Sequence, residues 1–287
     1  MHQKNTALAS TLVTFTLNGK TVVAPADRTI LETAEEQGID VPRLCYMEGM
    51  RPDGNCRTCM VEIKGERVLA PSCCRYPKDG MEVTTNSTRA LVSQKMSIEL
   101  LLADVPETSY TRDSELDLWA RKMGVGKPRF GSRPQPAEDL SHPAMAVHLD
   151  ACIQCKRCVR ACREEQVNDV IGYAFRGASS KIVFDFDDPM GNSTCVACGE
   201  CVQACPTGAL VPAREVATVV PDTTVDSVCP YCGVGCQLTY RIRDDRIVAV
   251  DGRDGPANRE RLCVKGRFGF EYVQRRGPRD DGPSTEA

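Results

Sequence analysis

Hydrophobic and polar residues alternate along residues 11–24, on either side of the pair Asn18-Gly19. This pattern is typical of a β-hairpin, because alternate side chains of a strand face opposite sides and Asn-Gly favours a tight turn. Thr29 is then expected to begin a helix, since Glu32 three residues later completes a capping box. The hairpin, the helix and the loop that follows predict a small α+β module.

Further along the chain, apolar residues recur at helical spacing and predict a helical segment over 89–124. Residues 126–143 are rich in proline and lack periodicity, so they are interpreted as a linker, and 212–228 as a second thin connection. Residues 237–251 are expected to form a hairpin. From Gln274 onward the chain is polar and is expected to be disordered.

Composition narrows the class of protein. Of the 287 residues, 41% are hydrophobic and 26% are charged, which is ordinary for a globular protein, but only 5% are aromatic and Trp119 is the single tryptophan. Domains with so few large aromatic side chains need another source of stability, and bound metal provides one because its binding free energy becomes folding free energy. The formal net charge of −3 gives no electrostatic basis for a nucleic-acid partner.

The location of the protein is inferred from two absences in the sequence. No stretch reaches the roughly 18 apolar residues of a membrane span, and residues 1–10 lack the apolar core of a signal peptide. We therefore expect a cytoplasmic protein without a membrane span. Because that compartment keeps thiols reduced, its 17 cysteines are expected to bind metal rather than to form disulfides.

Two cysteine blocks in the middle of the chain carry the clearest chemical signal. Each reads Cys-x-x-Cys-x-x-Cys-x-x-x-Cys, the spacing of two-cluster ferredoxins, in which the fourth cysteine of each run binds the other cluster. A tight loop can direct three thiolates to one face of a cubic cluster, and zinc instead prefers two separated cysteine pairs. The predicted ligands are Cys152, Cys155, Cys158 and Cys205 for one 4Fe–4S cluster, and Cys162, Cys195, Cys198 and Cys201 for the next.

The first cysteine block suggests a 2Fe–2S cluster. Cys45, Cys56 and Cys59 lie on one loop and a fourth cysteine follows after a gap, as in plant-type ferredoxins but with a longer first spacing. The fourth ligand is either Cys73 or Cys74; Cys73 is favoured, which leaves Cys74 without a cluster. The alternative is that these cysteines are buried structural thiols.

The last cysteine block has Cys229, Cys232 and Cys236 on one loop and Cys263 beyond the predicted hairpin. That hairpin would return Cys263 to the loop. The spacing suits a third 4Fe–4S cluster, and taken alone it also suits a zinc ribbon.

The motifs together resemble a known family. The stretch from Pro42 to Cys59, the run Cys-Pro-Tyr-Cys-Gly-Val-Gly-Cys at 229–236 and the run Leu-Cys-Val-Lys-Gly-Arg-Phe-Gly at 262–269 resemble the N-terminal part of the catalytic α subunit of NAD-dependent, molybdenum- or tungsten-containing formate dehydrogenases. The 2Fe–2S module is also similar to that of the large iron–sulfur subunit of complex I and of the diaphorase subunit of NAD-reducing hydrogenases. The resemblance spans 11–273 and favours a cluster over zinc in the last block.

The expected fold class is α+β, with domains in the order of the motifs. They are a β-grasp 2Fe–2S ferredoxin-type domain over 11–88, a helical segment and linker over 89–143, a two-cluster 4Fe–4S ferredoxin-type domain over 144–215, a small β-rich 4Fe–4S domain of molybdopterin-oxidoreductase type over 225–273 and a disordered tail over 274–287.

Two departures from the family change what the resemblance implies. Residues 75–141 contain neither Cys nor His, so the cluster that the family binds there with one His and three Cys is expected to be absent. The sequence also ends after the fourth motif. The metal–bis-pterin guanine dinucleotide and the formate-oxidising residues are therefore expected in a partner chain, whether the subunit is split or the reading frame truncated.

The resemblance implies an electron relay. Electrons from a metal–pterin formate-oxidising subunit would pass along the four clusters to a flavin subunit that reduces NAD, and Lys265 matches a family lysine between the nearest cluster and a pterin. No glycine-rich phosphate loop follows a strand, so neither a flavin or NAD site nor a catalytic residue is assigned to this chain. The alternatives are a relay without pterin contact in a hydrogenase- or complex-I-like NADH diaphorase assembly, and a zinc-binding scaffold. A hydrogenase diaphorase subunit would not need the motif at 229–269.

Two further groups of side chains receive structural interpretations. Four basic residues interleave the second cysteine block and are expected to form a solvated helix face, with tuning of a cluster potential or docking of an acidic partner as the alternative. The three histidines lack metal-ligand spacing and are expected at the surface or in the linker. The basic residues are Lys156, Arg157, Arg160 and Arg163, and the histidines are His2, His142 and His148.

Overall fold

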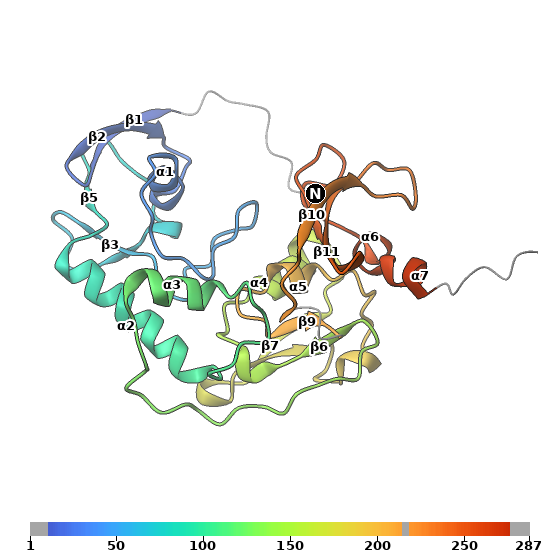
Figure 1. The fold of residues 1–287 in the computed structure, drawn as a ribbon. Coiled ribbons are helices and arrows are strands. Elements are labelled where there is room, and N and C mark those ends of the chain that lie inside the picture. Colours follow the sequence, from blue (N-terminus) through green and yellow to red (C-terminus); the bar gives the residue numbers. More distant parts are fainter. Residues whose placement is uncertain (1–10, 214–217, 276–287) are drawn as a thin grey trace, which may run out of the picture.

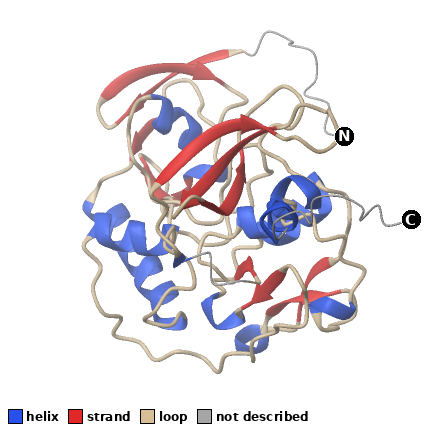
Figure 2. Ribbon diagram, turned by 45° about the vertical axis from the view of Figure 1, so that its right-hand side comes forward, coloured by secondary structure: helices blue, strands red, loops and turns tan. Residues whose placement is uncertain are grey.

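In the computed structural model, the described residues are 11–213 and 218–275, and they form several small units joined along the chain (Figure 1). The strands belong to separate small sheets rather than to one continuous sheet (Figure 2). Among these residues, no helix is long and apolar enough to cross a membrane.

The N-terminal unit is a five-stranded mixed sheet, with strand order β2-β1-β5-β3-β4, packed against α1. The predicted hairpin is confirmed, and its turn residues Asn18 and Gly19 both have positive φ. The capping box of α1 is also confirmed, since the side chains of Thr29 and Glu32 each accept a backbone N–H of the other. The elements are β1 (Leu12–Leu17), β2 (Lys20–Pro25), α1 (Ile30–Glu36), β3 (Met60–Ile63), β4 (Ala70–Pro71), the 3₁₀ turn η1 (Ser72–Cys74) and β5 (Glu82–Thr84).

The predicted helical segment over 89–124 is two helices, α2 (Thr88–Asp104) and α3 (Glu115–Met123). The break follows from the sequence, because a residue before proline is disfavoured in helical geometry and Val105, which precedes Pro106, is extended. Ser114 then starts α3 by accepting the backbone N–H of Asp117.

The middle unit is closed by β6 (Met145–Val147), which pairs antiparallel with β9 (Leu210–Pro212). Two short helices, α4 (Arg157–Arg160) and α5 (Glu200–Ala204), each begin inside a cysteine run. A hairpin that the sequence analysis did not predict stands between them. It consists of β7 (Ile171–Ala174) and β8 (Lys181–Phe184), and the remaining turns are η2 (Leu149–Ala151), the π-type η3 (Ala161–Glu165), η4 (Gly177–Ser179) and η5 (Met190–Asn192).

The C-terminal unit is an antiparallel sheet of β10 (Thr223–Val228), β11 (Gln237–Arg243) and β12 (Arg246–Gly252), followed by α6 (Val264–Phe268) and α7 (Phe270–Arg275). The predicted hairpin is confirmed as β11 and β12.

Two expectations for this unit were wrong. Residues 223–228 are a strand and not part of a thin connection. Gln274 is not disordered, because its side-chain amide donates to the carbonyl of Ile247 and accepts the N–H of the same residue. The tail from 276 lies outside the described residues.

Candidate metal centres

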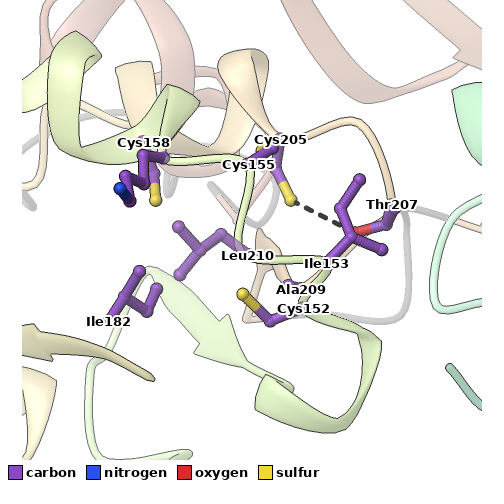
Figure 3. Close-up of a pocket in the computed structure, with 10 residues that line it drawn as sticks. Cys152, Ile153, Cys155, Cys158, Ile182, Cys205, Thr207, Ala209 and Leu210 are labelled. Atoms are coloured by element: carbon purple, nitrogen blue, oxygen red, sulfur yellow. Dashed lines mark hydrogen bonds between the residues drawn. The ribbon is translucent and has the colours of Figure 1, made fainter. Parts of the chain in front are cut away.

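The first predicted ferredoxin set lines one small cavity. Cys152, Cys155 and Cys158 come from the loop before α4 and from α4 itself, and Cys205 comes from the end of α5 (Figure 3). Apolar side chains such as Leu210 complete the lining. The structure therefore brings together the four thiols that the crossed ferredoxin pattern predicts for one site.

The second ferredoxin set lines a separate small cavity. Cys195, Cys198 and Cys201 lie on the loop that leads into α5, and Cys162 reaches them from the first run. The crossing is reciprocal: each run contributes three thiols to its own cavity and one to the other.

The two loops share a strained backbone pattern. The residue before the second cysteine of each run has positive φ, 57° at Gln154 and 55° at Ala197, and so does the residue after it, 58° at Lys156 and 73° at Gly199. Positive φ costs a non-glycine residue about 1–3 kcal/mol and persists where the surroundings enforce it. Here it turns backbone N–H groups toward sulfur: Gln154 donates to Cys152 Sγ at 3.4 Å and Ala197 donates to the Sγ of Cys195 at 3.4 Å.

The thiols of the first block gather between the N-terminal sheet and α2. Cys45, Cys59 and Cys73 are buried. Hydrogen bonds from Cys56 and then Cys73 hold the pKa of Cys45 well below its usual range, and a hydrogen bond from Cys73 lowers the pKa of Cys59. Cys74, by contrast, is exposed, and its Sγ lies 3.6 Å from the Sγ of Cys73. Cys73 is thus the member of the pair that contacts the loop thiols.

The thiols of the last block lie where β11, β12 and α6 meet. The backbone of Cys229 donates to the carbonyl of Cys236 at 2.8 Å, which closes the loop. Burial raises the pKa of Cys236, and it is raised further by the negative charges that Cys229, Cys232 and Cys263 would carry. The four thiols are therefore close neighbours. Cys232 and Cys263 are exposed, so this site opens to solvent.

The residues fit iron–sulfur clusters by three observations. Four thiols line each ferredoxin cavity, backbone N–H groups point at sulfurs, and all 17 cysteines are free. Among the residues that the structure describes, no three His, Cys, Asp or Glu side chains could hold a single metal ion. Burial raises the pKa of Cys152 to about 11 and of Cys155 to about 12, so a bound cluster would have to compensate for the buried thiolates.

The first block and the first ferredoxin set share one apolar cluster. It includes Cys45 and Cys155, with Cys56 at its edge, and α2 and α3 close it with Ile98 and Trp119. The two ferredoxin sets share another apolar cluster, which contains Cys158, Cys162 and Cys201.

The remaining junction joins the second ferredoxin set to the last block. Arg267, on α6, donates from Nε to the carbonyl of Cys198 at 3.2 Å, and its backbone N–H donates to the carbonyl of Cys263 at 3.0 Å. The four thiol sets therefore follow one another without an intervening unit.

The expected solvated face of basic residues was wrong for two of its members. Arg157 and Arg160 are buried, 4% and 3% exposed, because α4 packs against the first cysteine block. Lys156 lies over the ring of Tyr173, and Arg163 is exposed. Sequence alone showed the charges but not this packing, since both arginines donate to backbone carbonyls of the first cysteine block, at Tyr46 and Cys45.

His142 lies in the expected linker but is buried there, whereas His148 lies beyond the linker and is half-buried. His142 is 7% exposed, and the ring of His148 stacks on Tyr110 with centroids 3.8 Å apart. His2 lies outside the described residues. Lys265 is exposed on α6, two residues after Cys263.

Comparison with known families agrees with this geometry. Residues 10–88 match the 2Fe-2S iron-sulfur cluster binding domain, residues 151–209 the 4Fe-4S dicluster domain, and residues 222–275 the molybdopterin oxidoreductase Fe4S4 domain. The chain is an iron–sulfur electron-transfer protein of the oxidoreductase class, with one 2Fe–2S domain and further 4Fe–4S domains.

The relatives narrow this class. The chain is 34% identical to the second G-type subunit of NADH-quinone oxidoreductase from Rhizobium meliloti, over 92% of this chain and 32% of the relative. A putative formate dehydrogenase of Staphylococcus haemolyticus is 26% identical, over 90% of this chain and 31% of its own length. A solved NAD⁺-reducing [NiFe]-hydrogenase matches with a TM-score of 0.65 and 28% identity, over 70% of this chain and 87% of that chain.

The chain is thus similar, over nearly all of its own length, to a G-type NADH-quinone oxidoreductase subunit, and a formate dehydrogenase-like protein shares this similarity. The chain spans about a third of the length of these curated relatives.

Proposed function

We propose that this chain is the iron–sulfur electron-transfer part of an NAD-linked formate dehydrogenase assembly. It relays electrons from a metal–bis-pterin guanine dinucleotide site in a partner chain toward flavin/NADH-oxidoreductase subunits. The match of residues 222–275 to a molybdopterin oxidoreductase domain and the likeness to a putative formate dehydrogenase support this assignment. The cytoplasmic location expected from the free thiols is part of the same proposal.

The proposal assigns one 2Fe–2S cluster and three 4Fe–4S clusters to sixteen of the cysteines. When bound, such clusters accept and pass on single electrons. The chain's own residues hold the sites apart, bury the two ferredoxin sites and supply N–H groups to the ligand sulfurs. The ligand sets are Cys45, Cys56, Cys59 and Cys73; Cys152, Cys155, Cys158 and Cys205; Cys162, Cys195, Cys198 and Cys201; and Cys229, Cys232, Cys236 and Cys263.

The observation that carries the proposal is the continuous row of thiol sets. The first block shares an apolar cluster with the first ferredoxin set, the two ferredoxin sets share the next, and Arg267 joins the last pair. An electron relay needs successive centres without a gap, and a scaffold that bound isolated metals would not. The absence of Cys and His from 75–141 leaves this row intact, because the first block contacts the ferredoxin unit directly.

Lys265 is proposed to face the pterin of the partner chain. It is exposed, follows Cys263 closely and lies on the side of the row that ends at the open fourth site. A cation there would interact favourably with an anionic cofactor.

A second candidate is an electron relay in a hydrogenase- or complex-I-like NADH diaphorase assembly. The likeness to the NAD⁺-reducing hydrogenase and to the NADH-quinone oxidoreductase relative favours it. The domain at 222–275 argues against a hydrogenase diaphorase subunit, which has no need of a pterin-linked cluster domain. It does not separate the first candidate from a complex-I-like relay, because the NADH-quinone oxidoreductase relative matches over 92% of the chain.

The first test is metal analysis of the anaerobically purified chain. We expect about fourteen iron atoms and a matching amount of acid-labile sulfide per chain, the sum for one 2Fe–2S and three 4Fe–4S clusters. A colourless protein with zinc, and without a paramagnetic signal after dithionite, would overturn the proposal.

The second test separates the two candidates. Anaerobic affinity purification of the tagged chain from its native host is expected to recover a chain that carries a metal–pterin cofactor together with a flavoprotein. Recovery of a flavoprotein and a hydrogenase or quinone-reducing partner, with no molybdenum or tungsten, would favour the diaphorase relay instead.

A further inference from the structure

Arg160 occupies the junction between the first block and the first ferredoxin set. Its Nη2 donates to the carbonyl oxygen of Cys45 and lies 3.5 Å from that of Cys155. Its Nη1 donates to the carbonyl of Arg51, and its Nε donates to that of Lys156 at 3.4 Å. One guanidinium thus contacts the backbone of a predicted ligand at each of two neighbouring sites.

The charge of Arg160 is buried without a carboxylate partner. All four of its acceptors are peptide carbonyls, and none of the described residues places a carboxylate within ion-pair distance of it. The two other buried arginines differ: Arg157 forms a two-pronged ion pair with Glu115 at 2.5 and 2.8 Å, and Arg267 lies 3.4 Å from Glu200.

A buried cation without a countercharge is strongly unfavourable in a folded protein. Two carboxylates close to Arg160 in the sequence are paired with other cations: Glu164 with Arg51 at 3.1 Å and Asp169 with Arg163 at 2.5 Å. The thiolates of the two flanking sites are a further source of negative charge at this junction. A centre held by four thiolates is anionic, and each one-electron reduction adds one further negative charge.

We infer that Arg160 is a positioning residue that clamps the 2Fe–2S site to the first 4Fe–4S site and holds a positive charge between them, which makes both centres easier to reduce. The inference rests on the proposed electron relay and adds a residue to it. The clamp fixes the distance between the two centres through the carbonyls of Cys45 and Cys155. The charge stabilises the reduced form of each centre in a buried environment, where water screens it weakly.

The test is an EPR-monitored redox titration of the full chain carrying Arg160→Gln or Arg160→Met. We expect the midpoint potentials of the 2Fe–2S signal and of one 4Fe–4S signal to fall by about 59 mV or more, a tenfold change in a one-electron equilibrium. The midpoint potentials of the two more distant sites are expected to change by less than a third of that amount. Arg160→Lys keeps the charge, so it is expected to retain the wild-type midpoints while weakening the magnetic coupling between the two centres.

The matched control is the double variant Arg157→Gln with Glu115→Gln. It removes an ion pair from the same junction without changing the net charge, so the midpoints are expected to remain as in the wild type. Unchanged midpoints in both neutral Arg160 variants, or an equal fall in the control or in Arg160→Lys, would overturn the inference.

Failure to assemble clusters is also informative. If both neutral variants lack clusters while Arg160→Lys assembles them with wild-type midpoints, the charge itself is required, which supports the inference. If Arg160→Lys lacks clusters as well, a positive charge at this position is not sufficient, and the inference is overturned. A wild-type chain without clusters would instead overturn the proposed function. Failure of the inference and failure of the proposed function are therefore distinguishable.

Discussion

At the scale of single residues, the choice between two adjacent cysteines is set by where η1 points them. Cys73 is buried and contacts the loop thiols, while Cys74 is exposed. We therefore predict that Cys73→Ser abolishes or strongly alters the 2Fe–2S EPR signal, because it removes a thiolate ligand. Cys74→Ser serves as the control and is expected to leave the signal and the iron content unchanged. The reverse pattern would assign the ligand to Cys74.

A second prediction at this scale concerns a glycine at a close approach. Gly199 has φ of 73°, and a Cβ added there would overlap Cδ of the Arg267 side chain. Gly199→Ala therefore combines backbone strain with displacement of a buried arginine that joins two units. We expect it to lower the free energy of unfolding by about 3 kcal/mol, measured by anaerobic urea denaturation.

The control for that variant is Gly177→Ala. Its φ is 58°, but the added Cβ would meet nothing within 4 Å. Only the strain remains, about 1–2 kcal/mol. Equal losses in the two variants would show that the contact with Arg267 contributes nothing.

The residues that could be predicted from sequence are those whose role depends on near neighbours. The cysteine runs, the Asn18-Gly19 turn and the Thr29 cap belong to this kind, because their partners lie a few positions away. Arg157 and Arg160 do not, since each also donates to a backbone carbonyl more than a hundred positions away along the chain. Charge in a sequence indicates exposure until tertiary packing supplies such acceptors.

At the scale of elements, the capping box of α1 supports the first metal site. Glu32 accepts the backbone N–H of Thr29 at 2.7 Å and also the hydroxyl of Tyr46 at 2.9 Å, next to Cys45. Thr29→Ala removes one half of the box, and we predict a loss of about 1 kcal/mol in the free energy of unfolding. Urea denaturation followed by circular dichroism measures it.

The comparison variant is Thr21→Ala, an exposed position in β2 of the same unit. A change within about 0.5 kcal/mol is expected there, as for other surface substitutions. If both threonine variants lose the same free energy, the cap has no special role.

Element boundaries were predictable where a local breaker marks them. Pro106 ends α2 and could have been read as a break in the long helical pattern. The strand β10 gave no such signal, because Thr223–Val228 is almost wholly exposed and its sequence lacks an apolar alternation. It forms because β11 offers an edge to pair with, and that edge exists only in the folded unit.

At the scale of the whole molecule, the units differ in how far their cores depend on metal. The N-terminal core consists mainly of aliphatic and aromatic side chains, including Phe15, Leu17 and Ile30. In the middle unit the predicted ligands are themselves core residues, among them Cys158, Cys162 and Cys201. Removing the metal from a site of this kind removes folding free energy directly.

We therefore predict that iron chelation unfolds the chain unevenly. In hydrogen exchange followed by mass spectrometry, β6, β9 and the segment from 149 to 212 are expected to lose protection first, because several residues of their core are the predicted cluster ligands themselves. Strands β1 and β2 are expected to keep protection, since they pack against α1 without metal. Simultaneous loss in both units would mean that the junction at Arg160 couples them into one cooperative body. Repeating the exchange with Arg160→Gln would then separate them, because the clamp between the two units is gone.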